Sequence, residues 1–134
     1  MEKNYIDLIN AAFNAQKNAY APYSKFLVGA SVLTKSGKIY AGANIENASY
    51  PAGICAERVA ASKAISEGEK DFVAVCITCS ETTFAYPCGI CRQFLSEFSK
   101  NMDIIVAKSA DEYEIYKLYE LLPKNFDDNA LKNS

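Results

Sequence analysis

The sequence contains no histidine. Without imidazole groups, a transition-metal site in this chain would have to take most of its ligands from sulfur. Proton transfer near neutral pH would likewise fall to a carboxylate, a lysine or a thiol with a shifted pKa. The five cysteines are therefore the residues from which metal chemistry would have to come.

Long apolar runs and an excess of basic residues are also missing. No apolar stretch approaches the ~20 residues that a membrane-spanning helix needs. The net charge of −2 argues against nucleic-acid binding, which requires a basic face. We therefore expect neither a nucleic acid nor a membrane as a partner.

The chain has the composition of an ordinary globular protein, with 50% hydrophobic and 22% charged residues. Its length of 134 residues predicts one domain over 1–134. The start, Met1-Glu2-Lys3-Asn4, lacks the basic and then apolar order of a secretory signal. Because the cysteine count is also odd, we expect reduced thiols in a cytoplasmic protein.

Hydrophobic spacing and turn residues divide the chain into alternating helices and strands. Ile6, Ile9 and Phe13 recur at helical spacing, which predicts a first helix over residues 5–20. The further expected elements are a hairpin of 26–34 and 39–45, a helix at 56–67, a buried strand at 72–78, a helix at 88–99, a buried strand at 103–107, a short edge strand at 113–116, a helical turn at 118–122 and a frayed final helix from 127 onward. This order predicts an α/β fold, a three-layer α/β/α sandwich with a mixed sheet of about five strands.

Two short motifs supply three cysteines and one glutamate. Cys55-Ala56-Glu57 stands at the start of one predicted helix, and Pro87-Cys88-Gly89-Ile90-Cys91 at the start of another. Unpaired N–H groups and the helix dipole favour thiolates at a helix N-terminus. We therefore expect Cys55, Cys88 and Cys91 to bind one zinc ion with an open fourth position. Glu57 beside them is the expected proton carrier.

The charge of this cluster also needs a partner, since three thiolates and one divalent zinc ion sum to −1. Arg58 lies three residues after Cys55, so it is predicted to turn to the same face and hydrogen-bond the sulfurs. Arg92 is a weaker candidate, because its neighbour Cys91 points in another direction.

Cys76 and Cys79 allow a competing interpretation. With Cys88 and Cys91 they form a paired C-x-x-C pattern, which is typical of a closed zinc ribbon with four cysteine ligands, a non-catalytic interaction module. Residues three apart in a strand point to opposite faces, however, and the ribbon would leave Cys55 unexplained. We therefore expect Cys76 and Cys79 to be small core residues. A redox pair of Cys88 and Cys91 is a further alternative.

The motifs in combination resemble a known family. Cys-Ala-Glu at 55–57 and Pro-Cys-x-x-Cys at 87–91 match the zinc deaminase pattern. A cysteine at 55, where related deaminases carry histidine, is similar to the small homotetrameric zinc-dependent cytidine deaminases. The resemblance covers nearly the whole chain, through residues 19–26, 28–30, 42–50 and 121–123.

The resemblance implies a role for each matched residue. Cys55, Cys88 and Cys91 would bind one zinc ion per subunit, and Glu57 would shuttle protons. Among the implied substrate-binding residues, Phe26 would stack on the pyrimidine, and Asn44 and Glu46 would bind the ribose 3′-hydroxyl. Ala56 is a further implied substrate-binding residue. Ala48 and Tyr50 would reach a neighbouring subunit's pocket, and Phe126 would close another subunit's pocket.

Taken alone, several of these residues have simpler interpretations. Phe26 is more often a core residue than a stacking partner. Asn44 and Glu46 lie on one face of a strand end, which suits either a shared ligand or a solvated face. Tyr50 and Phe126 are loop aromatics.

The implied activity is hydrolytic deamination of cytidine and 2′-deoxycytidine to the uridines with release of ammonia. Zinc-bound hydroxide would attack C4 of the base, with Glu57 as proton shuttle. The resemblance also implies pyrimidine salvage in the cytoplasm and a homotetramer with shared pockets. Deamination of a related cytosine nucleoside, such as blasticidin S, is the alternative on the same zinc chemistry.

Overall fold

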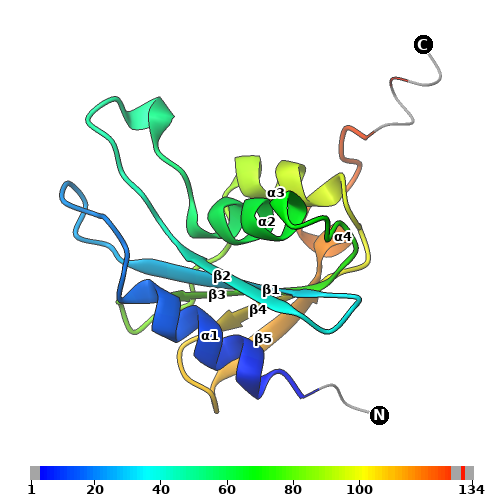
Figure 1. Cartoon of the computed structure of the whole chain (residues 1–134), viewed down its shortest axis with the longest axis horizontal. Coiled ribbons are helices and arrows are strands. Elements are labelled where there is room, and N and C mark those ends of the chain that lie inside the picture. Colours follow the sequence, from blue (N-terminus) through cyan, green and yellow to red (C-terminus); the bar gives the residue numbers. More distant parts are fainter. Residues whose placement is uncertain (1–3, 128–130, 132–134) are drawn as a thin grey trace.

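The computed structural model describes residues 4–127 and residue 131. A mixed five-stranded sheet lies between two layers of helices, with α1 on one face and α2 and α3 on the other (Figure 1). The bounds of the elements are α1 (Ile6–Gln16), β1 (Val28–Thr34), β2 (Ile39–Ala43), the 3-10 helix η1 (Tyr50–Ala52), α2 (Ala56–Ser66), β3 (Phe72–Cys79), α3 (Gly89–Ser96), β4 (Asp103–Ala107), β5 (Tyr113–Lys117) and α4 (Leu118–Leu121). The predicted three-layer sandwich is confirmed.

The strand order is β2-β1-β3-β4-β5. The strands β3 and β4 are parallel, and the other neighbouring pairs are antiparallel. A parallel pair requires a crossover connection, and here the crossover contains α3. The connection from β3 to α3 carries Cys88, so the topology itself brings the second cysteine motif to the end of the central strand.

Helices cover both faces of the sheet. Successive side chains of the central strands point to opposite faces, so each central strand packs against both helix layers. Ala74 and Cys76 of β3 pack in a core cluster with Leu8 and Ile9 of α1. Val75 and its alternate neighbours pack in a second cluster with α2 and α3. Near-continuous apolar runs such as β3 and β4 are what a sheet buried on both faces requires.

The helix α2 lies very close to the sheet. The side chains that it contributes to the core are small: Ala56, Ala60, Ala61 and Ala64. A Cβ atom on Gly42 of β2 would lie 2.7 Å from Val59 Cγ1 and 2.8 Å from the backbone nitrogen of Ala60. Glycine and alanine therefore allow the close contact that places the start of α2 beside the end of β2.

Several element ends differ from the predictions. The helix α1 ends at Gln16, and Tyr20, predicted to lie in it, instead pairs with Ile45. Cys88 is extended and caps α3 instead of opening it. The short helix η1 was not predicted. Most of the predicted final helix, 128–130 and 132–134, lies outside the described residues. None of the helices in the described part of the chain has the length and apolar character required to cross a membrane.

Candidate metal centre and adjoining pocket

Three cysteine sulfurs meet where two helices begin. Cys55 is the N-cap of α2, Cys88 is the N-cap of α3, and Cys91 lies in the first turn of α3. The Sγ atoms of Cys55 and Cys88 are 3.7 Å apart, and those of Cys88 and Cys91 are 3.4 Å apart. All three sulfurs lie within 4.8 Å of one another.

These separations fit a zinc ion. Tetrahedral coordination with Zn–S bonds of about 2.3 Å places neighbouring sulfurs about 3.8 Å apart. Within residues 4–127 and residue 131, no other group of three or more cysteine, aspartate or glutamate side chains comes together in this way. Three sulfur ligands leave the fourth position of a tetrahedral ion for another group, which is the arrangement of catalytic zinc sites.

The local charges favour thiolates. Arg58 Nη2 donates a hydrogen bond to Cys55 Sγ over 3.8 Å, as predicted. The pKa of the Cys55 thiol falls to about 5, chiefly because Cys91 hydrogen-bonds to its sulfur and also because Arg58 is close. The same hydrogen bond, together with burial, raises the pKa of Cys91. The contact with Arg58 thus favours the thiolate form of Cys55, the form that binds a metal ion.

Glu57 follows Cys55 by two residues in α2 and is only 4% exposed. Burial raises the pKa of its carboxyl, and the negative charge of Cys55 raises it further. A carboxyl group whose pKa is raised in this way holds a proton more readily than an exposed one, as a general acid must.

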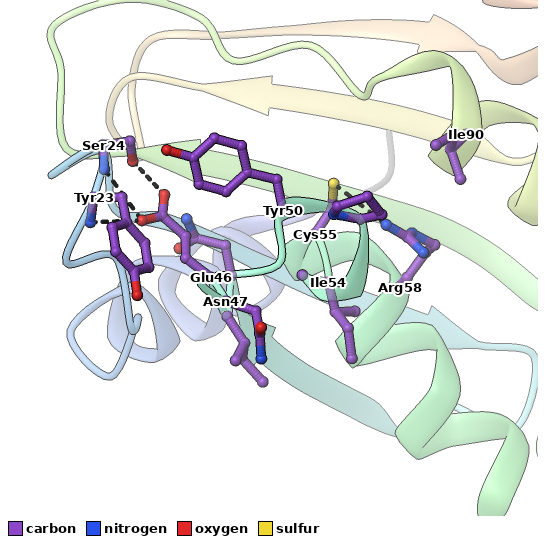
Figure 2. A pocket seen from close by; sticks show the side chains of 13 residues that line it. Tyr23, Ser24, Glu46, Asn47, Tyr50, Ile54, Cys55, Arg58 and Ile90 are labelled. Carbon is purple, nitrogen blue, oxygen red and sulfur yellow. Dashed lines mark hydrogen bonds between the residues drawn. The ribbon is translucent and has the colours of Figure 1, made fainter.

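A pocket of about 570 Å³ adjoins the cluster (Figure 2). Its size is within the range of small-molecule sites. Figure 2 shows Cys55 and Arg58 toward one end of the pocket and Glu46 with Ser24 toward the other. The lining residues are Tyr23, Ser24, Asn44, Ile45, Glu46, Asn47, Tyr50, Pro51, Gly53, Ile54, Cys55, Arg58 and Ile90.

Glu46 and Asn44 are both held by the loop that precedes β1. Glu46 Oε1 accepts hydrogen bonds from the backbone N–H groups of Tyr23 and Ser24, at 3.0 and 3.1 Å, and Oε2 accepts one from the Ser24 hydroxyl. Asn44 Oδ1 accepts from the backbone N–H of Val28, and its Nδ2 donates to the carbonyl of Phe26, both over 2.9 Å. The two side chains therefore hold this loop against the segment after β2.

The other candidate residues have different surroundings. Phe26 is half-buried and belongs to neither core cluster. Ala48 and Tyr50 are exposed, Tyr50 by 76%, and Phe126 is 61% exposed. Ala56 is fully buried in the core, so a contact between Ala56 and a ligand would have to come from its main chain.

The zinc-ribbon interpretation is wrong. Cys76 is fully buried in the cluster under α1, and burial raises the pKa of its thiol to about 12. Cys79 is 6% exposed, and its thiol hydrogen-bonds to the carbonyls of Glu81 and Thr83. Both are small buried residues, as predicted.

Arg92 and Ile90 are two further residues of α3 near the cluster. Arg92 donates to the carbonyls of Pro87 and Leu121, at 2.7 and 2.8 Å, so its guanidinium ties α3 to α4. Ile90 is 66% exposed and lines the pocket, a position that its apolar character alone does not indicate. As the second residue of α3, it lies at the helix end that faces the pocket.

Sequence reasoning gave no role in the pocket to Tyr23 and Ser24. Both lie in the matched stretch 19–26, and a serine can bind a carboxylate through its hydroxyl and through its N–H. The signal was therefore present, but no periodicity connects this loop with Glu46.

An open site of three sulfurs beside a buried carboxylate, on a three-layer sandwich, is the arrangement of a metal-dependent α/β enzyme. A family model of the cytidine and deoxycytidylate deaminase zinc-binding region matches residues 2–108. The chain therefore belongs to the cytidine and deoxycytidylate deaminase family.

Individual relatives agree with this assignment. A probable cytidine deaminase from Dictyostelium discoideum is 42% identical over 92% of this chain and 84% of the relative. A cytidine deaminase from Halalkalibacterium halodurans is also 42% identical, over 89% of this chain and 91% of the relative. The crystal structure of cytidine deaminase from Burkholderia pseudomallei superposes with a TM-score of 0.87 at 35% identity, covering 92% of this chain and 100% of that one.

Proposed function

We propose that this protein is a zinc-dependent cytidine deaminase, which hydrolyses cytidine and 2′-deoxycytidine to the uridines and ammonia. The observation that carries the proposal is the meeting of three sulfurs at the starts of two helices, with the buried Glu57 two residues after Cys55 and with Cys55 itself lining a pocket of about 570 Å³. Family membership and relatives named as cytidine deaminases support the choice of substrate.

In this proposal Cys55, Cys88 and Cys91 hold the zinc ion. The ion, when bound, supplies the Lewis acidity that makes water a nucleophile near neutral pH. Arg58 offsets the excess negative charge of the three sulfurs.

Glu57 is the group that moves protons. Its buried carboxylate takes a proton from the attacking water and delivers it to N3 of the base. It then carries the second proton to the amino group that leaves from C4, so that water and cytidine yield uridine and ammonia. A raised pKa suits this exchange, because the group must be a base and an acid in turn.

The far end of the pocket binds the sugar. Glu46 is an acceptor-only carboxylate that lines the pocket, so it pairs with a hydroxyl donor such as the ribose 3′-hydroxyl. Asn44 lines the same end and joins it in binding the ribose, and Phe26 stacks on the pyrimidine. Ala56 contributes through its main chain at the start of α2.

We further propose one domain over 1–134, a cytoplasmic enzyme of pyrimidine salvage, and a homotetramer that needs neither nucleic acid nor membrane. A single sheet with both faces covered supports the one-domain assignment. Tyr50 beside the pocket and Phe126 are largely exposed aromatic side chains, as expected for residues that, with Ala48, complete the pockets of neighbouring subunits.

The test combines metal analysis of the purified protein with an absorbance assay for conversion of cytidine to uridine. Glu57→Gln should retain bound zinc and lose turnover by about 10²- to 10⁴-fold, the usual contribution of a general acid–base. Near-normal turnover in this variant would remove the role of Glu57. Protein that contains no zinc, or that deaminates blasticidin S in preference to cytidine, would contradict the proposal.

A further inference from the structure

The hydroxyl of Ser24 connects the Glu46 carboxylate with the main chain of Phe26, the two residues assigned to the sugar and the base. It donates to Glu46 Oε2 and accepts from the backbone N–H of Phe26 over 3.0 Å. The N–H of Ser24 also donates to Glu46 Oε1. Figure 2 shows the contacts with Glu46 at the end of the pocket away from Cys55.

Glu46 would be poorly defined without these contacts. It lies after the end of β2, between the exposed residues Ile45 and Asn47. A glutamate side chain also has several rotatable bonds, which must be restrained to fix its carboxylate. A carboxylate offers about four acceptor positions. Ser24 and the N–H of Tyr23 occupy three of them, which leaves about one for a ligand.

We propose that Ser24 is a positioning residue for nucleoside binding. Its hydroxyl fixes the Glu46 carboxylate so that the remaining acceptor position faces the sugar hydroxyl, and it fixes Phe26 at the same time. This inference rests on the proposed function, because it takes a nucleoside as the ligand of the pocket.

The local backbone supports a fixed loop. Lys25, between the two residues that the hydroxyl joins, has a φ of 61°, in the left-handed region that non-glycine residues rarely adopt. Such a conformation persists only where the surrounding contacts determine it. The bonds of Asn44 to Phe26 and Val28 provide further contacts from the same segment as Glu46. A restrained binding group loses less entropy when the ligand arrives.

Serine is specifically suited to this role, since one hydroxyl donates to the carboxylate while it accepts from the N–H of Phe26. Alanine removes both bonds, and threonine keeps both. The Ser36–Glu69 pair provides a matched control: Ser36 Oγ donates to Glu69 Oε1 over 2.6 Å, and neither residue lines the nucleoside pocket.

The test measures binding of uridine and 3′-deoxyuridine to the zinc-loaded protein by calorimetry, together with KM and kcat for cytidine. In the wild type, removal of the 3′-hydroxyl should weaken binding. In Ser24→Ala, the affinity for uridine should fall about 10-fold, the scale of one hydrogen bond to a charged group. The affinity for 3′-deoxyuridine should change much less, and KM should rise more than kcat falls.

Ser24→Thr should restore most of the uridine affinity, and Ser36→Ala should bind both nucleosides as the wild type does. Equal losses of both nucleosides in Ser24→Ala would overturn the inference, as would unchanged affinity. If the wild type binds uridine through its 3′-hydroxyl but does not deaminate cytidine, the proposed function is wrong and the role of Ser24 in nucleoside binding is retained. A wild type that binds no nucleoside would overturn both.

Discussion

The two ends of the pocket are built from different kinds of structure. At the sulfur end, Cys55, Cys88 and Cys91 lie at the starts of α2 and α3, two helices packed against the core. At the carboxylate end, Glu46 and Ser24 lie in loops, and hydrogen bonds between them define their positions. The sulfur geometry thus depends on tertiary packing, whereas the carboxylate geometry depends on a few local bonds.

This difference predicts how substitutions act. A change at the sulfur end removes a ligand or a charge from a cluster that binds one metal ion together, so its effect on zinc affinity should be large. A change at the carboxylate end alters one hydrogen bond near solvent, so its effect should be small and confined to one part of the ligand.

The largest effect should come from removal of a sulfur ligand. Cys88→Ser replaces an exposed thiol, so the fold should remain, whereas zinc affinity should fall by roughly 10²- to 10³-fold. If ~10–16 kcal/mol of zinc binding is shared among three sulfurs, each contributes about 3–5 kcal/mol, and the serine hydroxyl, a weaker ligand, replaces part of that share. Competition with a chelating dye measures the affinity, and turnover should fall with metal content.

Cys79→Ser is the matched control, because its thiol lies on β3 outside the cluster and hydrogen-bonds to main-chain carbonyls that a hydroxyl can also reach. It should bind zinc as the wild type does. Wild-type zinc affinity in Cys88→Ser would show that the sulfurs do not hold the metal together.

A smaller effect at the same end should follow from removal of the Arg58 charge. In Arg58→Gln the sulfur of Cys55 loses its cationic hydrogen-bond donor, so zinc affinity should fall by about 10- to 100-fold, as for other partners of metal ligands. The same chelator competition measures it. Lys108→Gln removes one positive charge from a side chain that pairs with Glu112 instead of a sulfur, and it should leave the affinity unchanged. If both variants lose affinity equally, net charge and not the Arg58 contact controls the metal.

The sulfur end was predictable because its signals are local. The three-residue spacing of Cys88 and Cys91, the preceding Pro87 and the alanine-rich helix after Cys55 each indicate a helix start, and the structure has these cysteines where the pattern expects them. Arg58 followed from the same helical spacing. Spacing along the chain thus indicates each helix start, whereas the meeting of Cys55 with Cys88, 33 residues later, was inferred from the number of ligands that one zinc ion requires.

The carboxylate end was only partly predictable. Alternation along a strand end and the family resemblance singled out Asn44 and Glu46. The partner of Glu46, however, is Ser24, which lies 22 positions earlier in a loop with no periodic pattern. Ile90 shows the same limit, since apolar spacing on a short helix does not reveal that its first turn faces a pocket.

The smallest predicted effect concerns the charge of Glu46. The hydrogen bond from the Ser24 hydroxyl holds the pKa of this carboxyl below its ordinary value of 4.5. Because the folded-state pKa is lowered, the contact with Ser24 is fully present above that ordinary value and is lost as the pH falls through the folded-state pKa. Carbon-13 NMR of labelled glutamate should therefore give a pKa below 4.5 for Glu46 in the wild type and a higher value in Ser24→Ala.

Glu69 supplies the internal reference, because its pKa is lowered chiefly by Ser36. The pKa of Glu69 should be unchanged in Ser24→Ala and should rise in Ser36→Ala. In Ser36→Ala the pKa of Glu46 should stay as low as in the wild type. In the wild type, Glu46 should be ionised throughout the neutral range, so its contribution to uridine binding should not vary with pH there. In Ser24→Ala, acid should begin to weaken binding at a higher pH than in the wild type. Identical Glu46 titration curves in the wild type and Ser24→Ala would mean that the hydroxyl does not hold the carboxylate. The position of Glu46 would then not depend on this local hydrogen bond, and the proposed difference between the two ends of the pocket would be wrong.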